Sequence, residues 1–143
     1  MPKLTIDGVE IEAQDGQTVL QVALENGIHI PHFCYHPRLK IAGNCRMCLV
    51  EIEKVPKLQI SCGTEVRDGM VVDTKSEKVI TARRAVLEFL LINHPLDCPI
   101  CDQSGECKLQ DYCFEHGQAA SRFTEEKNTY PQLEIGPDIS RNM

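Results

Sequence analysis

The stretch "NHPLDCPICDQSGECKLQDYC", residues 93–113, holds four of the eight cysteines in a chain of 143 residues. Cys98 and Cys101 form a C-x2-C pair, and Cys107 follows after five further residues. Three thiols this close together are one short of a four-ligand metal site. The fourth ligand is His94, Cys113 or a residue outside the stretch. Ligation by cysteine alone is the commoner rule for [4Fe–4S] clusters, so chemistry by itself favours Cys113.

The histidines of the chain differ in their sequence context. Pro95 fixes the backbone directly after His94, at the predicted end of a helix and beside the cysteine-rich loop. His94 is therefore kept as a competing ligand. The remaining histidines have the ordinary explanation of surface or core residues, and no ligand role is assigned to His29, His32, His36 and His116.

The other four cysteines are Cys34, Cys45, Cys48 and Cys62, with the spacing C-x10-C-x2-C-x13-C. This spacing is that of plant-type [2Fe–2S] proteins with the first gap widened. Gly43 and the small residues around it favour turns that direct backbone amides toward cluster sulphurs. The alternative is a structural zinc site with four cysteine ligands. Zinc usually takes two C-x2-C knuckles and this set has one, so the spacing favours [2Fe–2S].

Composition and charge restrict the class of protein. Hydrophobic residues make up 42% and charged residues 25%, which predicts a packed globular chain. The net charge of −6 argues against nucleic acid as a partner. No apolar run reaches the ~20 residues that span a bilayer, and residues 1–8 lack the features of a signal or transit peptide. We expect a cytoplasmic prokaryotic protein, in which grouped cysteines indicate metal binding rather than disulfides.

The first half of the chain has the element order of a small α+β sheet domain. Residues 2–13 alternate around Asp7-Gly8, which predicts two strands joined by a tight turn. Thr18 caps a predicted helix that ends at Gly27. The buried face of this helix is expected to comprise Val19, Leu20, Val22, Ala23 and Leu24. Residues 28–48 form a long loop with three cysteines, and the segments 49–53, 58–62 and 69–74 are predicted strands.

The second half begins with a predicted helix over residues 79–93. We expect it to pack against two layers and to link the two metal sites rigidly. Arg83, Arg84 and Glu88 are placed on one flank, with Arg84 and Glu88 as a weak surface pair.

After Cys113 we expect a short helical piece and then extended chain. The chain lacks a G-x-G-x-x-G motif and a P-loop, so no nucleotide site is predicted. No catalytic role is assigned to Asp97, Asp102 and Glu106.

Three segments, "GNCRMCLVEIE", "LLINHPLDCPICDQSGEC" and "LQD", resemble the N-terminal region of the large iron–sulphur subunit of respiratory complex I, the NADH–quinone oxidoreductase. Related segments occur in NAD-linked hydrogenases and formate dehydrogenases. The resemblance extends from residue 1 to about residue 137. It implies a β-grasp, ferredoxin-like domain over residues 1–78 that binds one [2Fe–2S] cluster through Cys34, Cys45, Cys48 and Cys62. It also implies a helix and a small loop-rich region over residues 79–143 that bind one [4Fe–4S] cluster through His94, Cys98, Cys101 and Cys107. Cys113 is left as a free thiol.

The resemblance implies an electron conduit, a component of an NADH:quinone oxidoreductase (NADH dehydrogenase) complex. Its expected partners are a flavin-containing, NADH-oxidising subunit and other iron–sulphur subunits. The expected place is the cytoplasmic face of the inner membrane, with membrane contact only through partners. No substrate-converting site is expected in the chain. In the family the chain continues into further cluster motifs and a molybdopterin-enzyme-like domain, so this chain is expected to be a fragment or a short homologue. The alternatives are a subunit of an NAD-linked hydrogenase or formate dehydrogenase and, in another class, a zinc-stabilised interaction module.

Overall fold

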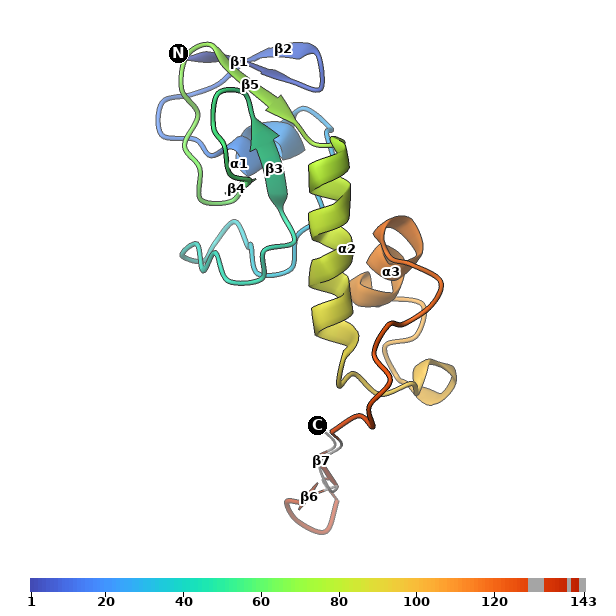
Figure 1. Ribbon diagram of the computed structural model, residues 1–143. Coiled ribbons are helices and arrows are strands. Elements are labelled where there is room, and N and C mark those ends of the chain that lie inside the picture. Colours follow the sequence, from blue (N-terminus) through green and yellow to red (C-terminus); the bar gives the residue numbers. More distant parts are fainter. Residues whose placement is uncertain (129–132, 139, 142–143) are drawn as a thin grey trace.

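The computed structural model describes residues 1–128, 133–138 and 140–141. A five-stranded mixed sheet forms the first part, with the strand order β2-β1-β5-β3-β4. Its strands are β1 (Lys3–Ile6), β2 (Val9–Glu12), β3 (Leu49–Ile52), β4 (Gln59–Ile60) and β5 (Met70–Asp73). β1 and β5 are parallel, and the other pairs are antiparallel. The helix α1 (Val19–Glu25) lies against this sheet (Figure 1). The predicted α+β class with a ferredoxin-like first domain is confirmed.

The first hairpin forms where the sequence predicts it. Asp7 and Gly8 have φ angles of 49° and 85°, the conformation that two-residue hairpin turns require. The register pairs Ile6 with Val9. The Asp7 carboxylate accepts hydrogen bonds from the backbone N and the Oγ1 of Thr74, at 2.7 and 2.6 Å. The turn is thereby attached to the chain that follows β5, just before the second part of the molecule begins.

The helix α1 is fixed at its start by a capping box. The side chain of Thr18 accepts from the Gln21 amide, and the Gln21 side chain accepts from the Thr18 amide. Four of the five residues predicted for its buried face are buried, namely Val19, Leu20, Val22 and Ala23. The prediction was wrong for Leu24, which is 37% exposed because it lies on the outer side of the helix.

The long helix α2 (Glu77–Leu91) extends from the sheet domain, and α3 (Lys108–His116) lies beside its lower half (Figure 1). The three charged residues that the sequence places on one flank differ in burial, and the predicted surface pair of Arg84 and Glu88 was wrong. Arg83 is buried, because it shares a face with Val79 and Leu87 at intervals of four residues. Glu88 pairs with Arg122, whose Nε donates to it at 2.8 Å, instead of with Arg84.

A second apolar cluster joins the two parts of the molecule. It consists of Met47 from the cysteine loop, Leu87 from α2 and Tyr112 from α3, with further residues packed against it. The helix α3 begins before Cys113 and includes it, so the predicted position of this helix was too late in the chain. The remaining elements are the short 3-10 helix η1 (Cys98–Ile100) and the pair β6 (Leu133–Glu134) and β7 (Ser140–Arg141). Within the described residues, no helix has the length and apolar character needed to cross a membrane.

Candidate metal centres

Strand pairing brings Cys48 and Cys62 together. β3 begins directly after Cys48 and pairs with β4, which ends two residues before Cys62. The Ser61 amide donates to the Cys48 carbonyl at 3.0 Å, which extends this pairing up to the cysteines. Both cysteines are 1% exposed and belong to the core of the sheet domain. The sequence placed Cys62 at the end of a strand, and the structure places it in the turn that follows.

The turn that contains Cys62 is held by the N-terminus of α1. The first amides of a helix lack partners within the helix. Here the Val19 amide donates to the Thr64 carbonyl at 2.9 Å, and the Leu20 amide donates to the Ser61 carbonyl at 3.0 Å. The helix start therefore fixes the backbone on both sides of Cys62. These two hydrogen bonds explain how α1, which begins at Val19, fixes the position of Cys62, more than 40 residues later in the chain.

The Cys34 thiol accepts hydrogen bonds from the loop that carries Cys45. Burial acts to raise the pKa of Cys34, but hydrogen bonds from the Cys45 backbone and thiol and from the Asn44 and Gly43 amides hold the pKa below its usual value. The loop turns back at Gly43, which has a φ of 62°. A Cβ at this position would lie 3.0 Å from the Cδ1 of Ile60. The predicted direction of small-residue amides toward a cysteine sulphur is thus present in the structure.

The four thiols of the first set influence one another. Burial raises the pKa of Cys62 to about 12, together with a hydrogen bond that the Cys62 thiol donates to Cys48 and the negative charges of Cys48, Cys34 and Cys45. Four soft sulphur donors within electrostatic reach, two of them buried, fit the ligand set of a [2Fe–2S] cluster. Within the described residues, no three His, Cys, Asp or Glu side chains are arranged around a single metal ion, whereas a [2Fe–2S] cluster takes its four ligands in pairs, two on each of its two irons.

The second set of cysteines lies in the turns between α2 and α3. Cys98 begins η1, Cys101 follows it, and Cys107 is the residue before α3. Gly105 has a φ of 87°, and its amide donates to the side chain of Gln110 at 3.2 Å. Cys98 and Cys101 are exposed, whereas Cys107 is half-buried. This site is therefore more open to solvent than the first one.

The two candidates for the fourth ligand lie on different elements. His94 is exposed and follows the end of α2, where its amide donates to the Leu91 carbonyl at 3.3 Å. Cys113 lies in α3 and packs against the second apolar cluster. Burial raises the pKa of Cys113, and the charges of Cys107 and Cys98 add to this effect. The side chain of Cys113 therefore lies within electrostatic reach of the second site while it belongs to the packed face of its helix.

Sequence reasoning missed two residues next to the sites. Arg83 is buried beside the segment that follows Cys48, and the interval of four residues from Val79 to Arg83 to Leu87 was the available signal. Lys127 donates from its Nζ to the carbonyls of Leu91 and Ile92, at 2.6 and 3.0 Å, and so satisfies the end of α2 just before His94. Its partner is distant in sequence, so no local pattern predicts this contact.

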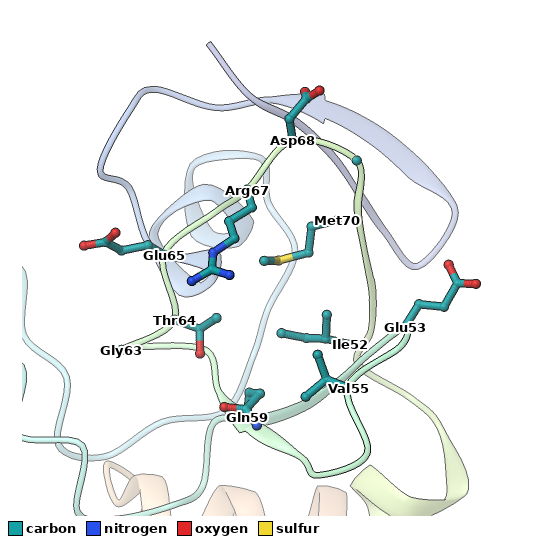
Figure 2. Close-up of a pocket in the computed structure, with 11 residues that line it drawn as sticks. Ile52, Glu53, Val55, Gln59, Gly63, Thr64, Glu65, Arg67, Asp68 and Met70 are labelled. Atoms are coloured by element: carbon teal, nitrogen blue, oxygen red, sulfur yellow. The ribbon is translucent and has the colours of Figure 1, made fainter.

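A surface hollow of about 550 Å³ lies elsewhere, beside the sheet (Figure 2). Ile52, Val55 and Met70 point toward one another inside it, and the acidic side chains of Glu53, Glu65 and Asp68 point outward. None of the eight cysteines, all of which lie in the described residues, lines this hollow. We assign it no part in the chemistry of the metal centres.

Two families of known domains match the chain. Residues 2–77 match the family described as "2Fe-2S iron-sulfur cluster binding domain". Residues 83–122 match the "NADH-ubiquinone oxidoreductase-G iron-sulfur binding region". The first match includes the first set of cysteines, and the second includes the stretch from His94 to Cys113. The predicted cofactor types, [2Fe–2S] and [4Fe–4S], are confirmed by these matches, which do not support the zinc alternative.

Known proteins resemble the chain over its full length. The G-type NADH-quinone oxidoreductase subunit of Rickettsia bellii (strain RML369-C) is 57% identical over 143 residues, which are 100% of this chain and 21% of that relative. The NADH-ubiquinone oxidoreductase 75 kDa subunit of Reclinomonas americana is 53% identical with the same coverage. A solved structure of an NAD+-reducing [NiFe]-hydrogenase in the H2-reduced state matches with a TM-score of 0.85 and 37% identity, over 97% of this chain and 58% of that one.

The chain spans 21% of the length of these curated relatives, and within that length the two matched families follow each other in the predicted order. The chain belongs to the family of 2Fe-2S iron–sulphur cluster binding domains, joined to the NADH-ubiquinone oxidoreductase-G iron–sulphur binding region.

Proposed function

We propose that this chain is an electron-carrying iron–sulphur segment of an NADH–quinone oxidoreductase. The observation that carries the proposal is the match of residues 2–77 to the [2Fe–2S] family, because this segment contains Cys34, Cys45, Cys48 and Cys62 and the pairing of β3 with β4 brings the last two together. The identity of 57% to a subunit of NADH-quinone oxidoreductase supports the choice of complex. When bound, the clusters supply one-electron transfer. The protein itself holds, shields and tunes them.

The proposed ligands of the [2Fe–2S] cluster are Cys34, Cys45, Cys48 and Cys62. The sheet and α1 fix Cys48 and Cys62 in a buried position, where access of water is restricted. The amides of residues 43–45 donate toward the Cys34 sulphur. Hydrogen bonds to cluster sulphurs and burial are the means by which a protein adjusts the reduction potential of such a centre.

The proposed ligands of the [4Fe–4S] cluster are His94, Cys98, Cys101 and Cys107. The match to the oxidoreductase-G iron–sulphur binding region over residues 83–122 supports this set. Two contacts support His94 over Cys113. Lys127 donates to the carbonyls of Leu91 and Ile92 at the end of α2, two to three residues before His94, and Cys113 belongs to the face of α3 that packs against the second apolar cluster. Cys113 is then a free thiol beside the cluster.

The wider assignment is also a proposal. We infer that the chain is organised as a ferredoxin-like domain over residues 1–78 and a cluster-binding region over residues 79–143. We propose that it works beside a flavin-containing, NADH-oxidising subunit and other iron–sulphur subunits. Its proposed place is the cytoplasmic face of the inner membrane, where partner subunits make the membrane contact. The conversion of NADH and quinone is assigned to those partners.

A second candidate is an electron-transfer subunit of an NAD-linked hydrogenase. The likeness to the NAD+-reducing [NiFe]-hydrogenase, with a TM-score of 0.85, favours it as the alternative. The higher identity to the NADH-quinone and NADH-ubiquinone oxidoreductase relatives favours the quinone-linked complex. Co-purification from the native source decides between the two, because association with hydrogenase activity instead of quinone reduction selects the hydrogenase.

Iron analysis and electron paramagnetic resonance of the anaerobically prepared protein test the ligand sets. We expect about six irons per chain, two plus four. Cys113→Ser should keep both signals, whereas Cys45→Ser should remove the [2Fe–2S] signal. His94→Cys should keep the [4Fe–4S] cluster and lower its midpoint potential, because thiolate is negative where imidazole is neutral.

Two outcomes oppose these assignments. A repeatable content near two irons, with Cys98 open to alkylation, excludes the second cluster. Loss of the [4Fe–4S] signal in Cys113→Ser, together with an unchanged spectrum and potential in His94→Ala, identifies Cys113 as the fourth ligand.

A further inference from the structure

A buried positive charge lies beside the first metal centre. Arg83 is in the middle of α2 and is 5% exposed. Its Nη2 donates to the carbonyl oxygen of Leu49 at 3.1 Å. Its Nε is buried and has no hydrogen-bond partner within the described residues. Among the described residues, the guanidinium group makes one hydrogen bond, to the residue directly after Cys48.

No carboxylate of the described residues lies within 4.0 Å of the Arg83 side chain. Asp7 is near enough to act on its charge, but both oxygens of Asp7 accept hydrogen bonds from Thr74. The neighbouring His116 carries no negative charge, and burial and Arg83 both lower its pKa. A buried charge without a partner is costly, so such charges are paired in native proteins.

The residue whose carbonyl oxygen Arg83 contacts, Leu49, directly follows the proposed cluster ligand Cys48. Burial lowers the pKa of Arg83, and the leading opposing influence is the negative charge of Cys48. A [2Fe–2S] cluster with four thiolate ligands carries a net negative charge, and that charge becomes more negative on reduction. A fixed cation nearby favours the more negative state more strongly, because the interaction grows with the charge.

We propose that Arg83 is the positive counter-charge of the [2Fe–2S] cluster and raises its reduction potential by stabilising the reduced form. It is a positioning residue, since its hydrogen bond reaches the cluster segment through Leu49. This inference rests on the proposed ligand set of the first centre.

The experiment is an anaerobic redox titration of the complete chain with both clusters, followed by electron paramagnetic resonance. Arg83→Met removes the charge and keeps much of the volume, and Arg83→Lys keeps the charge. Arg84→Met is the matched control, because it removes the same charge from the exposed face of the same helix. Iron content and circular dichroism establish that each variant is folded and loaded.

In Arg83→Met we expect the reduced-to-oxidised ratio of the [2Fe–2S] cluster at a fixed ambient potential to fall at least threefold. A tenfold fall corresponds to about 59 mV for a one-electron couple. Arg83→Lys should recover most of the wild-type ratio, and Arg84→Met should leave it unchanged. The reduced-to-oxidised ratio of the [4Fe–4S] cluster in the same sample serves as the internal reference.

A loaded Arg83→Met protein with the wild-type ratio overturns the inference, as does an Arg83→Lys protein that matches Arg83→Met. If Arg83→Met does not retain the [2Fe–2S] cluster, the Arg83→Lys variant decides. An Arg83→Lys protein that keeps the cluster with the wild-type reduced-to-oxidised ratio supports the counter-charge. An Arg83→Lys protein that loses as much iron as Arg83→Met overturns it. A wild-type protein that never assembles the [2Fe–2S] cluster refutes the proposed function instead, so the two failures are distinguishable.

Discussion

At the scale of single residues, the first metal centre depends on one backbone reversal at Gly43. Its φ of 62° is in the left-handed region, and the loop there directs three successive amides toward Cys34. An L-residue in this conformation costs about 1–2 kcal/mol. A Cβ would also meet the Cδ1 of Ile60 at 3.0 Å. The residue type at position 43 is thus set by conformation and by close packing together.

Gly43→Ala tests this dependence. We expect a lower free energy of unfolding by about 1 kcal/mol, and faster loss of [2Fe–2S] absorbance to an iron chelator, because the amides shift away from Cys34. Gly16→Ala is the control, since its φ of 84° imposes similar strain while nothing lies within 4 Å of the added Cβ. Equal rates of cluster loss in the two variants would show that the loop geometry at Gly43 does not protect the cluster.

At the scale of elements, a helix start and a cysteine turn are one structural unit. The Val19 and Leu20 amides donate to the turn around Cys62, and the capping box of Thr18 and Gln21 fixes those amides. Thr18 is 4% exposed, so its side chain has little access to water as a substitute partner. A change in the cap should therefore act on the metal centre through the helix start.

Thr18→Ala should lower the free energy of unfolding by about 1 kcal/mol, the usual cost of a lost helix cap. It should also reduce the [2Fe–2S] content under mild denaturant. The control is Ser76→Ala, which removes the cap of α2, where the Ser76 side chain accepts from the Val79 amide at 3.4 Å. The two variants are compared by denaturation curves in which the absorbance of the [2Fe–2S] cluster is measured. The coupling is contradicted if both variants lose the [2Fe–2S] cluster at the same denaturant concentration.

At the scale of the whole molecule, one apolar cluster connects the two sites. Met47, between two proposed cluster ligands, is fully buried against Leu87 of α2 and Tyr112 of α3. The Tyr112 hydroxyl also accepts from the His32 amide at 3.3 Å, which attaches α3 to the loop before Cys34. Figure 1 shows α2 extending from the sheet domain with α3 along its lower half. The two parts should therefore unfold cooperatively.

Leu87→Ala should test this cooperativity, because Leu87 is 1% exposed and lies in that cluster. Loss of a buried leucine side chain costs about 2–5 kcal/mol. We expect both the [2Fe–2S] and [4Fe–4S] signals to disappear together at lower denaturant concentration. Leu90→Ala, on the same helix and 42% exposed, should have a much smaller effect. Loss of one cluster while the other persists would show that the two parts unfold independently.

Much of this protein follows from local sequence. The Asp7-Gly8 turn, the Thr18 cap and the three sheet strands after the cysteine loop were predicted, because each depends on a few neighbouring residues. The cysteine spacings indicated two clusters for the same reason, since loop ligands are close in sequence. The choice between His94 and Cys113 came from family resemblance, because both lie within reach in the sequence.

Only the tertiary structure decided the contacts between distant segments. The four-residue interval places Arg83 on the face of Val79 and Leu87, but its contact with the Leu49 carbonyl at the start of β3 comes from the packing of α2 against that strand. Glu88 pairs with Arg122 across 34 residues instead of with Arg84 one turn away. The Cys62 turn rests on the start of α1, more than 40 residues earlier. Sequence alone determined the types and order of the proposed ligands, because these are local and chemical. The surroundings of those residues depend on packing, which local patterns do not encode.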